Sequence, residues 1–380
     1  MTSLSPLAPP SVAPLSERFE SVARIAVLRG GGLGDLLFAV PAVEALAAAY
    51  PRASITLLGS PVHEQIIRDR LSVDIRFEPV PVAPGIRDGE SDPARVEAFF
   101  ARNAGTFDLA VQLHGGGRFS NPFLLRLLAA HSIGCATPDA EPLERTIPYL
   151  YYQHEALRAL EVVGLAGVGP VMLEARLSVT DEDRAAGDLA LDLLGDHGDA
   201  PVAVVHPGAT DPRRRWPAGC FAALAVRLTG EGFRVIVVGD GPDVELASHI
   251  ADTATRGSGA VVSLAGRLSI PELMGVLASA TVFVGNDSGP RHLAQAVGVP
   301  TVGIYWFGNL INAGPLGRER HRIQLGWTTV CPVCGRDATQ VGWSAERCEH
   351  DVSFVADVSI DSVVEDAMSL TARTVPARGR

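Results

Sequence analysis

Short apolar runs alternate with amphipathic stretches along most of the chain. Near the start of the chain, the apolar run 25–28 predicts a buried strand. Apolar residues then recur at helical spacing over 36–50, and Pro51 ends that helix before a second strand at 55–59. A strand, a helix and a second strand in this order form a βαβ unit, so we expect a parallel sheet covered by helices.

The same order of elements returns in the second half of the chain. A strand at 202–205 precedes a helix that begins near Pro217, and another strand follows at 235–239. A third unit comprises the helix 270–280, the strand 281–285, the turn 286–290, the helix 291–297 and the strand 301–305. Two such regions separated by a middle stretch predict two doubly wound α/β domains.

Length and composition narrow the class of protein. The chain has 380 residues, 47% of them hydrophobic and 20% charged, which predicts two packed domains and argues against disorder. Its net charge of −11 argues against nonspecific nucleic-acid binding through a basic surface. Residues 1–22 lack the basic start and apolar centre of a signal peptide, so we expect a flexible tail there. No apolar run reaches the roughly 20 residues that a transmembrane helix needs.

The first candidate site follows the strand 25–28 and consists of the glycine-rich turn 30–34 and Asp35. Glycines let the backbone turn sharply and lie close to a ligand or a neighbouring helix. A dinucleotide-binding loop is disfavoured, because the spacing is not G-x-G-x-x-G and the Asp35 carboxylate would repel a phosphate. Asp35 is better suited to act as a general base or to cap the helix, and the local sequence leaves both roles open.

Two more polar clusters follow strand ends in the second half. Thr210 and three consecutive arginines lie between a strand and a helix start, where phosphate binding is favoured over a merely solvated surface. At the next strand end, the backbone N–H groups of Ser288 and Gly289 are expected to bind an anion. Asp287 as a helix cap and His292 as a core residue are the alternatives, but their place at a strand end favours ligand binding.

Three stretches of the sequence resemble glycosyltransferase family nine, the ADP-heptose heptosyltransferase family. They are residues 24–42, residues 206–217 and residues 287–294, which occur in the family's order across most of the chain. Each stretch alone is unspecific, but the combination is specific. The resemblance implies an inverting, metal-independent transferase without a catalytic cofactor, which moves a heptose or similar sugar from an ADP-sugar donor to an acceptor hydroxyl.

The resemblance also implies the GT-B fold, an α/β architecture of two facing Rossmann-like domains. With the tail at 1–22, we expect an acceptor domain at 23–178, a nucleotide-sugar donor domain at 179–355, and at 356–380 a helix that crosses back, followed by a tail. The acidic run 181–183 fits both a helix first turn and the D-x-D pattern of metal-dependent glycosyltransferases. No apolar strand leads into that run, which favours the helix.

The resemblance assigns roles to individual residues. Asp35 is the general base, and Arg214 occupies the position of a donor-phosphate lysine, keeping the charge while gaining bidentate geometry. The rest of the expected site is Gly31, Gly32 and Gly34 at the acceptor cleft, and Thr210, Asp287, Ser288, Gly289 and His292 at the donor. The middle region of the chain does not identify the acceptor.

The five cysteines form a separate feature. In a chain without a secretion signal they point to reduced thiols or a metal site. Cys331 and Cys334 form a C-x-x-C knuckle with a glycine behind it, and Cys348 and His350 follow. Three thiolates and an imidazole can hold zinc or iron tetrahedrally, so we expect a structural metal site. A redox pair and a loop of free cysteines are the alternatives.

Other functions remain open at this point. A nucleotide-sugar epimerase of the same fold would need no acceptor, and a non-catalytic module would bind donor without turnover. An NAD-dependent oxidoreductase is disfavoured by the broken glycine pattern and by Asp35. The acceptor is a glycan, a protein or a small molecule, and we expect no nucleic-acid partner. We expect the protein in the cytoplasm, free or peripheral at the inner face of the membrane; its oligomeric state is unknown from the sequence.

Overall fold

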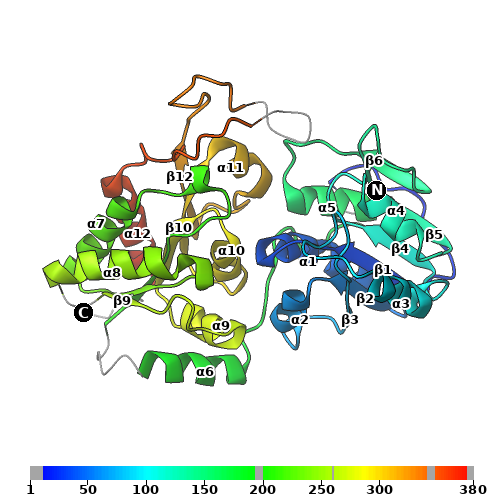
Figure 1. The fold of residues 1–380 in the computed structure, drawn as a ribbon. Coiled ribbons are helices and arrows are strands. Elements are labelled where there is room, and N and C mark those ends of the chain that lie inside the picture. The colour runs from blue at the N-terminus through cyan, green and yellow to red at the C-terminus, as the bar shows by residue number, and fades with distance from the viewer. Residues whose placement is uncertain (1–11, 193–199, 259–260, 340–346, 375–380) are drawn as a thin grey trace, which may run out of the picture. The chain divides into compact units, whose positions relative to one another are not determined.

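The computed structural model describes residues 12–192, 200–258, 261–339 and 347–374 (Figure 1). The chain divides into two compact units, Met1–Ala175 and Arg176–Arg380. Each unit contains one six-stranded sheet, and neighbouring strands in both sheets are parallel. The predicted α/β class with two Rossmann-like units is therefore confirmed.

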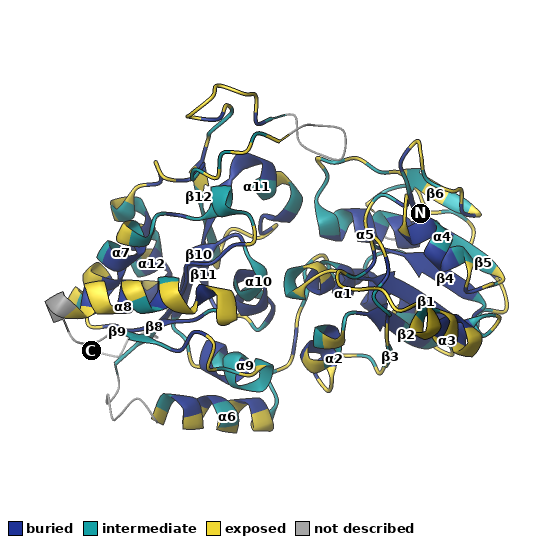
Figure 2. Cartoon of the chain, in the orientation of Figure 1, coloured by how far each residue is buried: buried dark blue, intermediate teal, exposed yellow. Residues whose placement is uncertain are grey.

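The first unit is built on a sheet with the strand order β3-β2-β1-β4-β5-β6. Its central strands are almost continuously apolar because helices pack on the sheet, and Figure 2 shows these strands as buried. The elements are β1 (Arg24–Arg29), α1 (Leu33–Ala49), β2 (Ser54–Gly59), α2 (Pro61–Ile67), β3 (Arg76–Pro79), α3 (Pro93–Asn103), β4 (Leu109–Gln112), α4 (Ser120–Leu125), β5 (His131–Ala136), β6 (Arg145–Pro148) and α5 (Glu155–Gly164).

The second unit has the strand order β12-β11-β10-β7-β8-β9. Two short 3-10 helices, Pro212–Arg214 and Gly241–Asp243, follow β7 and β8. The elements are α6 (Asp181–Asp192), β7 (Val202–His206), α7 (Ala218–Gly230), β8 (Arg234–Val237), α8 (Val244–Ser258), β9 (Val261–Ser263), α9 (Ile270–Ala278), β10 (Val282–Asn286), α10 (Gly289–Ala296), β11 (Thr301–Trp306), α11 (Phe307–Ala313), β12 (His321–Gly326) and α12 (Ile360–Thr374).

The acidic run at the start of the second unit is the first turn of α6, as the helix interpretation predicts. Asp183 is fully buried, and its carboxylate accepts the backbone N–H of Thr180 at 3.0 Å. The Thr180 hydroxyl accepts the backbone N–H of Asp183 at 3.1 Å in return. This reciprocal capping occupies the carboxylate in holding the helix end, and the D-x-D alternative finds no support here.

The segment expected to be a flexible tail is in part packed on the first unit. Residues 1–11 lie outside the described residues. Phe19 is buried, stacks on the ring of His131 at 4.1 Å between centroids, and lies under the guanidinium of Arg145. Arg18 donates to the carbonyl of Ala49 at 2.9 Å. A buried aromatic residue and hydrogen bonds such as that from the backbone N–H of Ser16 to Gly164 O at 3.0 Å together hold this segment.

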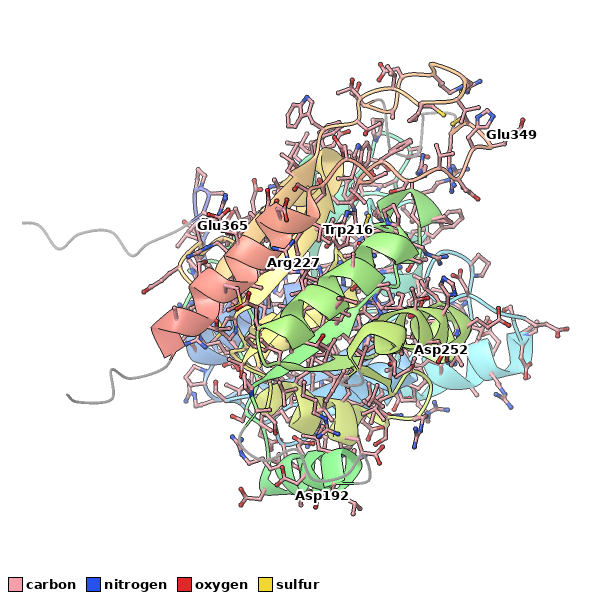
Figure 3. The ribbon with its side chains drawn as sticks, turned by 90° about the vertical axis from the view of Figure 1, so that its left-hand side faces the viewer. Asp192, Trp216, Arg227, Asp252, Glu349 and Glu365 are labelled. Carbon is pink, nitrogen blue, oxygen red and sulfur yellow. The ribbon has the colours of Figure 1, made fainter. Side chains whose placement is uncertain are left out.

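The last helix is predicted by the resemblance to cross back to the first domain. The structure packs α12 against α7 and the strands β10, β11 and β12 of its own unit. Figure 3 shows α12 beside α7, where Arg227 donates to Asp361 at 2.7 Å. Its buried positions, which join the core of the second unit, are Val363, Val364, Ala367 and Leu370.

The strand order of each sheet predicts where a ligand binds. In the first unit β1 lies between β2 and β4, and in the second β7 lies between β8 and β10. The chain therefore leaves β1 and β7 in one direction across the sheet and later returns to the other side. Loops diverge at such a point, and ligands of doubly wound folds bind in the crevice at the carboxyl ends of these strands.

Candidate active site

In the second unit, one buried amide joins the loops at the carboxyl ends of β7 and β10. Asn286 is the last residue of β10 and is fully buried. Its amide nitrogen donates to the carbonyl of Pro207 at 2.7 Å, and its amide oxygen accepts the backbone N–H of Trp216 at 3.0 Å. The sequence analysis missed this residue, although a polar residue ending an apolar strand was a usable signal.

Asp287 follows directly and forms the centre of a charged cluster. Its side chain is 4% exposed, with Oδ1 3.1 Å from His292 Nε2 and Oδ2 3.3 Å from Arg214 Nη1. Burial is the largest single effect and acts to raise the pKa of this carboxyl, but the hydrogen bond and the charge of His292, together with the nearby arginines, outweigh it, so the net pKa is lowered. The positive charges of Arg214 and Arg291 add to the lowering. Asp287 is therefore held as a carboxylate.

Ser288 precedes α10 and connects to a second polar chain. Its hydroxyl donates to the carbonyl of Asn286 at 3.1 Å and lies 3.0 Å from His206 Nδ1. The other ring nitrogen, Nε2, lies 3.2 Å from Asp243 Oδ2, and the hydrogen bond with His206 lowers the pKa of that carboxyl. His206 and Asp243 thus orient the Ser288 hydroxyl, and Asp243 was not predicted from the sequence.

The three consecutive arginines do not form a merely solvated surface. They lie in the arginine loop, defined here as residues 211–216 between β7 and α7. The Arg213 guanidinium donates to both carboxylate oxygens of Asp211, and the shortest of these hydrogen bonds is 2.6 Å. Arg215 donates to Ala209 O at 2.8 Å. Of these arginines, Arg214 contacts Asp287. Thr210 is exposed on the bend before this loop.

The structure therefore brings Arg214, Asp287 and His292 together, with Ser288 beside them. A guanidinium and a hydroxyl here adjoin the N-terminus of α10, which starts at Gly289 and carries positive partial charge. Phosphate oxygens bind at such helix ends and pair with guanidinium groups. The arrangement is suited to hold a diphosphate, while Asp287 can accept hydrogen bonds from hydroxyl groups.

In the first unit, Asp35 lies in the first turn of α1 with its side chain half exposed. Its Oδ2 accepts the backbone N–H of Gly32 at 2.9 Å, so the helix-capping role is present. Arg29 donates from Nη2 to Oδ1 at 2.9 Å and from Nε to the Asp35 carbonyl at 2.8 Å. Each carboxylate oxygen has two lone pairs, so these contacts leave the side chain able to accept a proton.

The glycines beside Asp35 are required by close packing. A Cβ on Gly30 would lie 2.3 Å from the carbonyl oxygen of Ile86. Gly31 has φ +86°, a conformation that other residues rarely adopt, and a Cβ there would lie 2.5 Å from Asp35 Oδ2. Gly32 is the N-cap of α1, and Gly34 is its second residue. The turn thus places backbone close against the Asp35 carboxylate.

A buried histidine, which was not predicted from the sequence, supports this turn through hydrogen bonds to its backbone carbonyls. His63 is fully buried, and its Nδ1 accepts the backbone N–H of Ser60 at 3.3 Å. Its Nε2 lies 3.1 Å from Gly31 O and 3.2 Å from Gly32 O, so the proton is on Nε2. Burial lowers the pKa of His63, which keeps the ring neutral at pH 7. His63 follows a strand end, which was the signal for it.

Arg29 is part of a buried charge network behind Asp35. Its side chain is 6% exposed, and Nη1 lies 3.6 Å from Glu155 Oε2. Glu155 also pairs with Arg158, whose side chain is 5% exposed. A buried guanidinium without an anion is costly, so the pairing orders both Arg29 and the carboxylates around it. These partners come from β1 and α5, which are far apart in the sequence.

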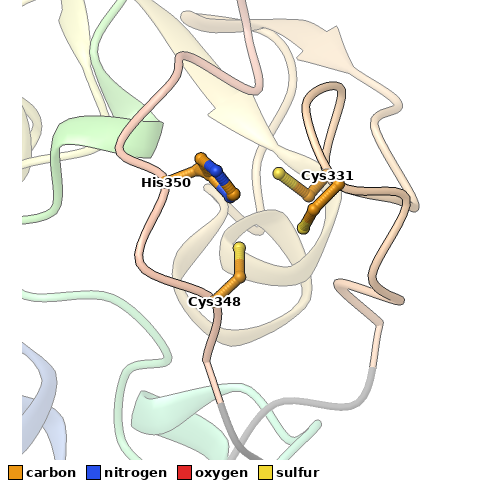
Figure 4. Close-up of side chains that lie close together, drawn as sticks. Cys331, Cys348 and His350 are labelled. Carbon is orange, nitrogen blue, oxygen red and sulfur yellow. The ribbon is translucent and has the colours of Figure 1, made fainter.

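The four predicted metal ligands lie together in the second unit. The ligand atoms of Cys331, Cys334, Cys348 and His350 all lie within 4.8 Å of one another (Figure 4). Backbone N–H groups, first that of Cys334, lower the pKa of Cys331 to about 6, which favours the thiolate that metals bind. His350 Nδ1 is buried without a hydrogen-bond partner among the described residues. The donor set and this unsatisfied nitrogen fit zinc or iron.

Comparison with known proteins relates the chain to one family. The model of glycosyltransferase family 9 (heptosyltransferase) matches residues 150–332. Lipopolysaccharide heptosyltransferase 2 of Escherichia coli (strain K12) is 31% identical over 172 residues, 45% of this chain and 47% of the relative. The structure of E. coli ADP-heptose lps heptosyltransferase II aligns with a TM-score of 0.69 at 18% identity, over 92% of this chain and 99% of that chain. These likenesses point to glycosyltransferase family 9.

The match at residues 150–332 includes two of the three resembling stretches, 206–217 and 287–294, and the structural likeness agrees with the GT-B fold class. The chain spans about half the length of the curated E. coli relative that it matches. A second solved structure of this fold is the iron-containing dodecameric glycosyltransferase TibC from enterotoxigenic E. coli H10407. It aligns with a TM-score of 0.55 at 14% identity, over 96% of this chain and 82% of that chain.

Within the described part of the chain, no helix combines the length and the apolar content needed to cross a bilayer. Cys135 is buried, and burial raises its pKa to about 12, so it is an inert core thiol. Cys220 is partly buried and packs against the core of the second unit.

Proposed function

We propose that this protein transfers a heptose, or a closely related sugar, from an ADP-sugar to an acceptor hydroxyl, with inversion at the anomeric carbon and without a catalytic metal. The observation that carries the proposal is the cluster of Arg214, Asp287 and His292 beside the N-terminus of α10, at the strand ends where β7 and β10 adjoin. The match to family 9 and the ADP-heptose named for a structural neighbour support the choice of donor.

The donor diphosphate is expected to bind in the second unit. Arg214 contributes a guanidinium, Ser288 a hydroxyl and Gly289 a backbone N–H at the start of α10. Thr210 is exposed on the adjoining bend and is assigned a phosphate contact by the resemblance. Asp287, held as a carboxylate by His292 and Arg214, then accepts hydrogen bonds from hydroxyl groups of the donor.

The reaction is a single displacement. The acceptor oxygen attacks the anomeric carbon, while the bond from that carbon to the diphosphate oxygen breaks and ADP leaves with the electron pair. Asp35 takes the acceptor proton as general base, which is consistent with its half-exposed carboxylate in a turn of glycines. Positive groups at the donor site stabilise the charge that develops on the leaving diphosphate.

The four ligands Cys331, Cys334, Cys348 and His350 are proposed to hold a structural zinc or iron ion. Such a site adds folding free energy and orders the loops that supply its ligands. An iron-containing glycosyltransferase of the same fold supports this assignment. The acceptor is proposed to be a hydroxyl of a glycan, since the matched E. coli relative is named for lipopolysaccharide.

The proposal is tested by coupling donor specificity to acceptor dependence. Purified protein is incubated with ADP-heptose, UDP-glucose or NAD, with and without heptose-free lipopolysaccharide core glycan, and release of the nucleoside diphosphate is measured. We expect ADP release from ADP-heptose that rises at least tenfold when the acceptor is added. Consumption of nucleotide-sugar at a rate that does not depend on the acceptor would instead support an epimerase. Binding of the nucleotide-sugar without release of the nucleoside diphosphate would support a non-catalytic module.

Arg29 is predicted to position the general base. Arg29→Lys keeps one positive charge but loses the fork that contacts both the carboxylate and the carbonyl of Asp35. We expect kcat for transfer to fall about tenfold, in line with one lost charge-assisted hydrogen bond, while the Kd for ADP is unchanged. Arg126→Lys, which replaces an exposed arginine of the same unit, is the control. A variant that changes Kd and leaves kcat unchanged would contradict the role.

A further inference from the structure

The segment that leaves the metal ligands runs along the arginine loop. It is called here the return segment and comprises residues 347–355, with the ligands Cys348 and His350 near its start. Figure 3 labels Glu349, between these two ligands, and Trp216 at the end of the arginine loop. Both stretches belong to the second unit, and 131 or more residues separate them along the chain.

Two hydrogen bonds fix the backbone on both sides of Arg214. The backbone N–H of Phe354 donates to the carbonyl of Arg213 at 2.7 Å. The hydroxyl of Ser353 donates to the carbonyl of Arg215 at 2.6 Å. Because these carbonyls flank Arg214, the return segment holds the backbone from which its guanidinium extends.

Side chains strengthen the same contact. Arg213 lies over the ring of Phe354, with its guanidinium carbon 5.4 Å from the ring centroid. Arg347 Nη2 lies 3.8 Å from Asp211 Oδ1, and the same Asp211 carboxylate forms the ion pair with Arg213. Phe354 is 1% exposed and belongs to the core of the second unit. The far end of the return segment is thus anchored by burial, while its near end carries the metal ligands.

The cysteine knuckle is held to the sheet by separate contacts. Cys331 donates its N–H to the carbonyl of Arg336 at 2.8 Å, which closes the knuckle. Trp306, the last residue of β11, donates to Thr328 O at 2.7 Å, three residues before the knuckle. The Thr328 hydroxyl also donates to the carbonyl of Phe354 at 2.8 Å, which ties this stretch to the far end of the return segment. A metal ion would add a second link, from the knuckle to the near end of the return segment.

We propose that the metal ion held by Cys331, Cys334, Cys348 and His350 fixes the return segment against the arginine loop and thereby sets the affinity for the donor diphosphate. The ion contacts no substrate; its effect passes through the carbonyls of Arg213 and Arg215 to Arg214. The inference rests on the proposed function in one respect, namely that Arg214 binds the diphosphate. Loss of metal then weakens nucleotide binding as well as stability.

The test uses Cys334→Ser, which removes an exposed ligand, and Cys220→Ser as the matched control outside the cluster. Metal content is measured by elemental analysis and ADP affinity by titration calorimetry on the full chain. We expect Cys334→Ser to lose its metal and to bind ADP about tenfold or more weakly, since at least two hydrogen bonds to the arginine loop lose their support. The control should retain metal and wild-type affinity. A metal-free variant that binds ADP like the wild type overturns the inference, as does a wild type that contains no metal.

Two further measurements keep the test decisive. Ser353→Ala should keep its metal yet bind ADP about 2–10-fold more weakly, as expected for one lost hydrogen bond, and Ser353→Thr should restore binding.

If Cys334→Ser does not fold, wild-type protein is stripped with a chelator and reloaded with Zn²⁺ or Fe²⁺. ADP affinity that falls and recovers with the metal supports the inference, and affinity that ignores the metal overturns it. A metal-loaded wild type that binds no ADP rejects the proposed function itself.

Discussion

Asp35→Asn is expected to lose about 10²–10⁴-fold in kcat for sugar transfer, the range that general-base catalysis supplies, while ADP binds with wild-type affinity. The asparagine keeps the size of the side chain and an oxygen that can accept from Arg29, but it cannot take up the acceptor proton. Steady-state ADP release with the acceptor gives kcat, and titration calorimetry gives the affinity for ADP.

Asp92→Asn is a close control for this variant. Asp92 also caps a helix of the first unit, accepting from the backbone N–H of Ala94 at 2.9 Å, and its side chain is half exposed like that of Asp35. Both substitutions weaken a cap, so each is expected to lower the free energy of unfolding by about 1 kcal/mol or less. Turnover should fall only in Asp35→Asn. Wild-type turnover in that variant would remove Asp35 from the mechanism and leave capping as its function.

Arg214→Ala is expected to raise the Kd for ADP about 10–100-fold, because a hydrogen bond to a charged group contributes about 1.5–3 kcal/mol. The substitution also removes the cation that lies 3.3 Å from the buried Asp287 carboxylate, so this carboxylate then depends on His292. Binding is measured by titration calorimetry with ADP, which isolates the diphosphate contact from the acceptor.

Two variants separate a specific phosphate contact from a general effect of charge. Arg214→Lys keeps the charge and is expected to stay within about tenfold of the wild type, since one ammonium replaces the guanidinium fork. Arg227→Ala removes an exposed arginine of α7 in the same unit, which pairs with Asp361, and should leave the Kd unchanged. Equal losses in Arg214→Ala and Arg227→Ala would show that net charge, not position, governs binding.

Much of the fold was predictable because it depends on local patterns. The apolar runs at 25–28, 202–205 and 281–285 correspond to the strands β1, β7 and β10. Parallel strands buried under helices read as continuous apolar runs, and glycines and prolines marked their ends. The same rule drew attention to Asp287, which directly follows β10, and to Asp35, which comes after the glycine turn that follows β1. The tail was harder to predict, because its packing rests on one buried aromatic residue, Phe19, and on contacts with residues far away in the sequence.

The supporting residues of both sites were not predictable from the sequence. Glu155 reaches Arg29 from 126 residues away, and Asp243 reaches His206 from 37 residues away. Nothing in the residues around either acid distinguishes it from an ordinary helix-start acid. The role of Asn286 was hidden for the same reason, since its two hydrogen-bond partners, Pro207 and Trp216, lie 79 and 70 residues earlier.

The sequence by itself determined the type and order of the elements, the strand ends that carry the polar clusters, and the four ligands of the candidate metal site. Those features follow from periodicity, turn residues and the chemistry of cysteine and histidine, all of which are local. Only the tertiary structure decided that Arg214, among three adjacent arginines, contacts Asp287, and that the return segment hydrogen-bonds on both sides of it. These pairings depend on where distant segments pack against one another, and packing of distant segments leaves no periodic signal in a single sequence.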